Sequence, residues 1–218
     1  MTKKICFLLI SAVFAFALSG CISHSKTSTY ILCPDENAAK QYNALVRVNA
    51  IELPEYLDRS MIMVRVSKHT IGSLKGHQWV QNFKKMIQNS LAANLLLRSN
   101  GSNEAPQFSV FVKIERFELD SQNTLKVSAE CSLYTNPPKG AKQFCKSFPF
   151  TANYNWDGVN VDALIGLHDK ALSDMAELIA GPLVQTVSGK EILAYDSASD
   201  RFAVYAGLFE NFTLDTVS

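Results

Sequence analysis

The order of secondary-structure elements predicts an α/β fold in which helices pack on a mixed β-sheet. Two stretches with the residue pattern of strands come first, and an amphipathic helix follows them. Three further strands and a second helix complete the series. The strands are recognised by alternation or by β-branched residues, and the helices by apolar residues that recur about every four positions.

The predicted strands span residues 44–52, 61–67, 107–119, 125–134 and 143–153. Residues 107–119 alternate most clearly between apolar and polar side chains, and the carboxylates near the end of this stretch (Glu115, Glu118 and Asp120) are expected to be solvated. Pro149 lies inside the last strand. Since proline has no N–H for a ladder, that strand is expected at a sheet edge or at a bulge.

Both predicted helices carry an apolar stripe. In residues 77–98 the stripe is Trp79, Phe83, Ile87, Leu91 and Leu95, with Val80 and Met86 beside it. We interpret this stripe as core rather than as a ligand contact. The second helix spans roughly 160–180, with Leu164, Leu167, Ala171, Met175, Leu178 and Ile179 on its buried face. Gly181-Pro182 is expected to kink or end it.

The first twenty residues have the pattern of a secretory signal peptide. Two lysines precede the apolar run Ile5–Leu18, which is shorter than the ~20 residues of a membrane-spanning helix. The run ends in Leu-Ser-Gly-Cys, which resembles the lipobox of bacterial lipoproteins. The resemblance implies cleavage between Gly20 and Cys21, a diacylglyceryl group on the Cys21 sulfur and acylation of the new amine. The alternatives are an ordinary signal peptide with a chance cysteine and a retained membrane anchor.

Residues 21–29 are predicted to be a short polar tether between lipid and folded domain. Ile22, rather than aspartate, follows the cysteine. In enterobacteria-like sorting this resembles an outer-membrane address, with the domain in the periplasm. The inner membrane remains the alternative if the organism does not follow that rule.

Composition excludes several function classes. The chain has 21 Lys and Arg against 20 Asp and Glu and no basic block, so nucleic acid is not an expected partner. The histidines and cysteines lack metal-ligand spacing, and no phosphate-cradling loop or catalytic nucleophile motif is present. We therefore expect no enzyme activity, no cofactor and no metal site.

Besides Cys21, the mature chain contains Cys33, Cys131 and Cys145. Cys131 and Cys145 lie at equal distances from residue 138, in a turn between two predicted strands. A hairpin centred there would place them opposite each other, which allows a disulfide. A register shift of one residue would instead place the two side chains on opposite faces.

Two stretches resemble the ABC-type transport auxiliary lipoproteins, the PqiC-like family. They are "LPEYLDRSMIMVRVS" at 53–67 and the tryptophan-led "WVQNFKKMIQNSLAANL" at 79–95. The resemblance extends from residue 30 to about 185. Ser60, where many members have proline, and a long tail depart from the pattern. The family's fold is similar to the TolB N-terminal domain (anticodon-binding-domain-like), with a mixed five-stranded sheet. The sequence is therefore divided into one domain at 30–187 and a tail at 188–218, with a short helix possible in the tail.

The resemblance also implies a function. Members serve ABC transporters with MCE-domain proteins, which move lipids or apolar molecules between two membranes, and some members form rings. The expected partner contacts are Pro54, Tyr56, Leu57, Asp58 and Arg59, together with Phe202, Tyr205 and Phe209 in the tail. The loop residues could instead only close the loop, with Asp58 capping and Arg59 pairing with a carboxylate. A lipid-binding carrier and a cell-wall enzyme are the alternative functions.

Overall fold

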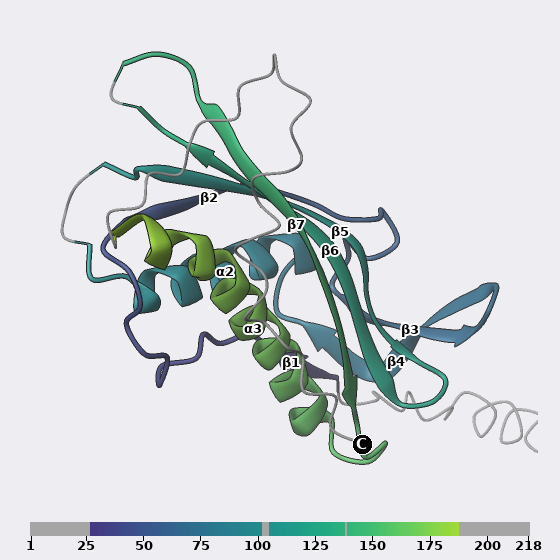
Figure 1. The fold of residues 1–218 in the computed structure, drawn as a ribbon. Coiled ribbons are helices and arrows are strands. Elements are labelled where there is room, and N and C mark those ends of the chain that lie inside the picture. The colour runs from purple at the N-terminus through teal and green to yellow at the C-terminus, as the bar shows by residue number, and fades with distance from the viewer. Residues whose placement is uncertain (1–26, 102–104, 138, 188–218) are drawn as a thin grey trace, which may run out of the picture.

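One mixed sheet and two helices make up the part of the chain that the computed structural model describes, residues 27–101, 105–137 and 139–187. The strands are β1 (Ser28–Tyr30), β2 (Val46–Glu52), β3 (Met61–Ser67), β4 (Thr70–Trp79), β5 (Phe108–Asp120), β6 (Thr124–Thr135) and β7 (Gln143–Asn155). The helices are α2 (Phe83–Arg98) and α3 (Val161–Val187), and Figure 1 shows both.

The strand order is β1-β4-β3-β5-β6-β7, and β2 also pairs with β5. The β1–β4, β2–β5 and β3–β5 pairs are parallel, and the other pairs are antiparallel. The predicted α/β fold with a mixed sheet is therefore confirmed. The described sheet has seven strands rather than five, since β1 and β4 were not predicted. Glycines at 72 and 76 interrupt the alternation of β4, which pairing with β3 nevertheless holds extended.

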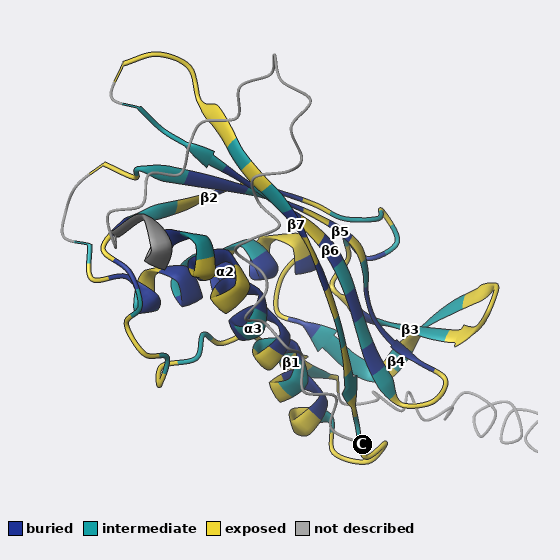
Figure 2. Cartoon of the chain, viewed as in Figure 1, coloured by how far each residue is buried: buried dark blue, intermediate teal, exposed yellow. Residues whose placement is uncertain are grey.

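The two helices cover one face of the sheet, and their buried sides meet it (Figures 1 and 2). Ile87 and Leu91 of α2 and Met175 of α3 are fully buried there. Val80 and Leu178, expected in the same stripes, are exposed instead.

The first helix begins later than the sequence predicts. Trp79 is the last residue of β4, and its N–H donates to the carbonyl of Ser60 over 2.6 Å. Val80 donates to Tyr30 over 2.8 Å, so residues up to 80 are held by neighbouring extended chain. The helix starts only at Phe83.

The second helix does not end at Gly181-Pro182. Pro182 lies inside α3, which continues to Val187. Leu183, the next residue, is fully buried in the core, and this packing compensates for the hydrogen bond that proline cannot donate. Pro149 lies in β7, which is the last strand of the sheet, as the proline predicts.

The predicted disulfide between Cys131 and Cys145 is not formed, and both are free thiols. Cys131 pairs with Phe148 across the β6–β7 hairpin. A bulge in this hairpin leaves Cys145 without a residue opposite it. The pairs nearest the turn, Tyr134 with Phe144 and Thr135 with Gln143, are centred on residue 139 rather than 138, so equal spacing from 138 does not bring the two cysteines together. Burial raises the pKa of the Cys131 thiol to about 12.

Candidate functional site

The loop between β2 and β3 contains the residues expected to contact a partner. It turns tightly, with the N–H of Leu57 donating to the Pro54 carbonyl over 2.9 Å. Leu57 is only 1% exposed and belongs to the core. Leu57 is thus unavailable to a partner, contrary to expectation, while Glu55 and Arg59 on either side of it are exposed.

A buried carboxylate holds the same loop against the sheet. Glu118 of β5 is fully buried, and its Oε1 accepts a hydrogen bond from Nε of Arg65 on β3. Arg116 Nε lies 3.2 Å from the same oxygen. The Tyr56 hydroxyl interacts with both Glu118 and Arg65; burial, followed by the nearby Glu118, raises the pKa of Tyr56. The cluster of Tyr56, Arg65, Arg116 and Glu118 is called the Glu118 cluster below.

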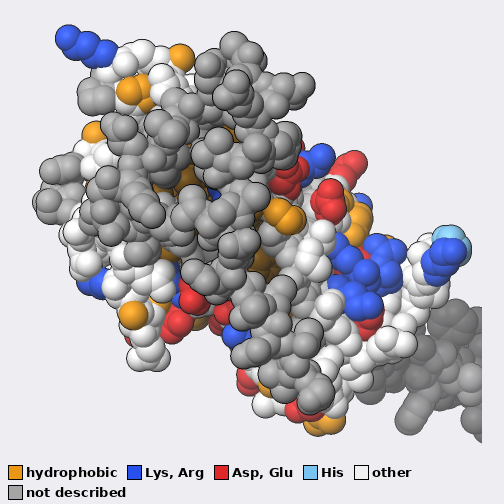
Figure 3. Space-filling model, in the orientation of Figure 1, with side chains coloured by type: hydrophobic (Ala, Val, Ile, Leu, Met, Phe, Trp, Pro, Cys, Tyr) orange, Lys and Arg blue, Asp and Glu red, His pale blue; other side chains and the backbone are white. Residues whose placement is uncertain are grey.

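The expectation that the β5 carboxylates are solvated is wrong for Glu118 and Asp120. Both are buried, and Asp120 Oδ2 pairs with Lys126 Nζ at 2.9 Å. Figure 3 shows Lys and Arg side chains gathered on the β3 side of the molecule with acidic side chains beside them. The strand pattern predicts that Glu118 faces solvent. It is buried because β3 and the β2–β3 loop, both distant in sequence, lie over it. The sequence offers one indication of this burial: Arg65, in "MVRVS", is a charged residue inside a mostly apolar strand and could be expected to pair with a buried carboxylate.

Asp58 and Arg59 join the loop to α2 through their backbones. The Asp58 carbonyl accepts a hydrogen bond from Asn82 Nδ2 over 3.3 Å, and the Arg59 carbonyl accepts one from the N–H of Phe83 over 3.2 Å. Carbonyl groups thus satisfy donors at the start of the helix, where a side-chain cap by Asp58 was the alternative. Within the described residues the Arg59 side chain forms no ion pair.

Trp79 and His168 form an aromatic cluster inside the core. Trp79 is 2% exposed and stacks on Phe83 at a centroid distance of 4.9 Å. The His168 ring stacks on Phe117 at 5.3 Å and meets the edge of Trp79 at 5.2 Å. The interpretation of Trp79 as a core residue is confirmed.

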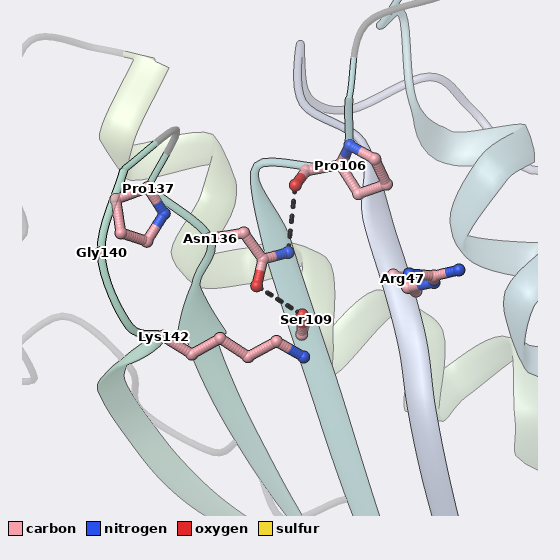
Figure 4. A pocket seen from close by; sticks show the side chains of 7 residues that line it. All are labelled: Arg47, Pro106, Ser109, Asn136, Pro137, Gly140 and Lys142. Carbon is pink, nitrogen blue, oxygen red and sulfur yellow. Dashed lines mark hydrogen bonds between the residues drawn. The ribbon is translucent and has the colours of Figure 1, made fainter.

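A concave region of the surface lies where β2 and β5 begin and β6 ends. It is a pocket of about 300 Å³ lined by Arg47, Pro106, Ser109, Asn136, Pro137, Gly140 and Lys142 (Figure 4). Ser109 Oγ donates to Asn136 Oδ1 over 2.7 Å, and Asn136 Nδ2 donates to the Pro106 carbonyl over 3.0 Å. These bonds fix one wall of the pocket. The sequence does not predict this pocket, because its residues come from three separate segments of the chain.

Among the residues that the structure describes, no three His, Cys, Asp or Glu side chains gather at metal-binding distance. No helix in that part of the chain is long and apolar enough to cross a membrane. Gly20 and Cys21 and the tail residues Phe202, Tyr205 and Phe209 lie outside the described residues.

Solved structures resemble this fold. One, from Xanthomonas campestris and assigned to the DUF330 family, is 17% identical, with a TM-score of 0.60 over 75% of this chain and 100% of its own. Another, described as an uncharacterized protein, is also 17% identical, with a TM-score of 0.57 over 71% of this chain and 97% of its own. At such identities the likeness supports the fold alone. No curated protein matches the chain.

The family comparison covers most of the described domain. A model of the family described as "ABC-type transport auxiliary lipoprotein component" matches residues 32–180. This range includes the β2–β3 loop, the Glu118 cluster, α2 and most of α3. The chain belongs to the family of ABC-type transport auxiliary lipoprotein components.

Proposed function

We propose that the protein is the lipid-anchored auxiliary component of an MCE-type ABC transport system, which moves lipids or apolar molecules between the inner and outer membranes. Acyl chains on Cys21 hold it at the outer membrane, and the domain docks on the MCE protein in the periplasm. Several acyl chains suffice for stable anchoring where one is marginal. Because some family members form rings, the proposal includes a homo-oligomeric ring. Native mass spectrometry would measure the number of copies in it.

The packing of the domain supports docking over the alternative of lipid carriage. The side chains between sheet and helices fill the core, where Ile87, Leu91 and Met175 are fully buried. The pocket lined by Arg47 and Lys142, of about 300 Å³, and a second one of about 240 Å³ lined by Glu115, Ser128 and Glu130 among others, have polar and charged side chains in their walls. A carrier needs a deep cavity with a mostly apolar lining. The filled core is the observation that carries the proposal.

The β2–β3 loop and the tail are the proposed contacts. In the loop, the exposed side chains of Glu55 and Arg59 are available to a partner, whereas Leu57 is not. In the tail, Phe202, Tyr205 and Phe209 supply aromatic groups. Aromatic residues and arginine are the residue types that dominate interface energies.

Co-purification of the acylated, full-length mature protein with its cognate MCE protein tests the proposal. We expect Arg59→Glu to weaken binding by about tenfold or more. Lys85→Glu, the same charge change at an exposed position on α2, is the matched control. Circular dichroism verifies that both variants fold.

Two mass-spectrometric measurements complete the test. The N-terminal peptide is expected to begin at an acylated Cys21. An unmodified terminus at another residue refutes the anchor. Stoichiometric lipid in protein purified alone, without any MCE binding, favours the carrier and overturns docking.

A further inference from the structure

Three aromatic side chains stand on the sheet face that the helices leave open. Val110 and Val112 of β5 are fully buried toward the helices, so Phe111 between them points to the opposite face. The Phe111 ring meets Tyr134 of β6 edge-on at 5.1 Å, and Tyr134 meets Phe144 of β7 at 5.5 Å. Phe144 is 43% exposed. This is an apolar surface outside the core.

Two cations border these rings. Lys142 Nζ lies 5.5 Å from the centroid of the Phe111 ring, and Arg47 is in register with Ser109, the residue two positions before Phe111. Both cations are exposed and line the same pocket (Figure 4). Neither forms an ion pair with a carboxylate of the described chain. The surface formed by Arg47, Phe111, Tyr134, Lys142 and Phe144 is called the sheet-face patch below.

The chain contains a segment with complementary chemistry. Residues 188–218 carry five acidic and two basic side chains, a net charge of −3. They also contain five aromatic residues: Tyr195, Phe202, Tyr205, Phe209 and Phe212. From Phe202 to the end there are two acids and no base.

The position of the last described residue permits the contact. The described chain ends at Val187, the last residue of α3. Figure 1 shows this end of α3 toward the end of the molecule where β2 and β5 begin. At ~3.3 Å per extended residue, the tail is long enough to pass around a sheet edge.

We propose that residues 188–218 dock on the sheet-face patch of the same molecule. Tail aromatic rings contact Phe111, Tyr134 and Phe144, while tail carboxylates pair with Arg47 and Lys142. Aromatic pairs contribute beyond their buried area, and the two cations select an acidic segment. Docking covers the same tail side chains that the proposed partner contact uses, so partner binding and docking compete.

Photo-cross-linking of the full-length mature protein, without any partner, tests this. Phe144 is replaced by photo-reactive benzoylphenylalanine, and cross-linked peptides are identified by mass spectrometry. We expect cross-links to residues 188–218. The control position is Val159, which is 82% exposed and precedes α3, and it is expected to give few.

Charge reversal then tests the role of the cations. Each exposed ion pair is expected to change the cross-link yield by a factor of about two to five. Arg47→Glu with Lys142→Glu should therefore lower the yield, and 0.5 M salt should lower it in the wild type. The matched control is Lys84→Glu with Lys85→Glu, on the exposed side of α2, which should leave the cross-link yield unchanged.

Equal yields at positions 144 and 159, or a yield that charge reversal leaves unchanged, would overturn the proposal. A mixture of isotope-labelled and unlabelled protein identifies the chain that supplies the tail. Cross-links that join a labelled chain to an unlabelled chain would show a second copy as the occupant and refute docking within one molecule. Because no MCE protein is present, these outcomes are independent of the proposed transport function.

Discussion

Protonation of His168 is expected to destabilise the fold at mildly acidic pH. The side chain is 2% exposed and lies among the rings of Trp79, Phe83 and Phe117. Its Nδ1 lies 2.8 Å from the carbonyl of Leu164, which only accepts, so Nδ1 carries the proton of the neutral ring. Burial lowers the pKa of His168 to about 4, although the hydrogen bond to Leu164 opposes the shift.

The sign and size of the effect follow from linkage. Histidine in the unfolded chain titrates near pH ~6.5, so between about pH 4 and 6.5 the unfolded state binds more protons than the folded state. Stability from the neutral ring is fully present above the unfolded pKa and is lost as pH falls through the folded pKa. At ~1.36 kcal/mol per pKa unit the whole window corresponds to about 3 kcal/mol, and the step from pH 7 to pH 5 to about 2 kcal/mol.

Denaturant unfolding of wild type and His168→Phe at pH 7 and pH 5 measures this. The phenylalanine keeps a flat ring beside Phe117 and cannot be protonated, so the loss of about 2 kcal/mol should disappear. His69→Asn, at an exposed position between β3 and β4, should behave like wild type. Burial raises the pKa of Asp169 to about 6, which acts in the opposite direction, so the difference between proteins isolates His168. If His168→Phe keeps the wild-type pH slope, the reasoning is refuted.

Two further predictions concern the Glu118 cluster and the strand register. Arg65→Met removes one partner of a buried carboxylate and is expected to lower the free energy of unfolding by about 3 kcal/mol, with a smaller loss when Glu118→Gln is added. Equal losses in chemical denaturation would contradict this coupling. Phe148→Cys is expected to form a disulfide with Cys131 under oxidising conditions, while wild type retains free thiols at Cys131 and Cys145. Peptide mapping checks it, and a Cys131–Cys145 bridge in wild type would show that the register is wrong.

The regular parts of the fold could be predicted because their patterns are local. The strand predicted at 61–67 coincides with β3, and β5 and β6 differ from prediction by one residue at each end. The stripe from Phe83 to Leu95 correctly marks the buried side of α2. Trp79 fits the same four-residue spacing, yet hydrogen bonds to distant backbone hold it in a strand. Periodicity does not distinguish a helical residue from a strand residue that happens to share its spacing.

The contacts of the candidate site depend on which strands pair and in what register, and no local sequence pattern predicts either. Arg65 reaches Glu118 because β3 and β5 run parallel with Val64 opposite Leu119. These strands are separated in sequence by β4 and α2. The pairing of Cys131 with Phe148 likewise depends on one bulge between Leu133 and Tyr134. This bulge shifts by one residue every pair that lies farther from the turn.

The fixed position of the β2–β3 loop determines what a partner can recognise there. Leu57 is held in the core, Tyr56 is held at the Glu118 cluster, and the Arg59 carbonyl is held at the start of α2. A loop fixed at three points loses little conformational entropy on binding, which favours affinity. The side chains left exposed, Glu55 and Arg59, are charged. We therefore expect a partner of this loop to recognise it by charge, and we expect aromatic contacts to come from the tail or from the sheet-face patch.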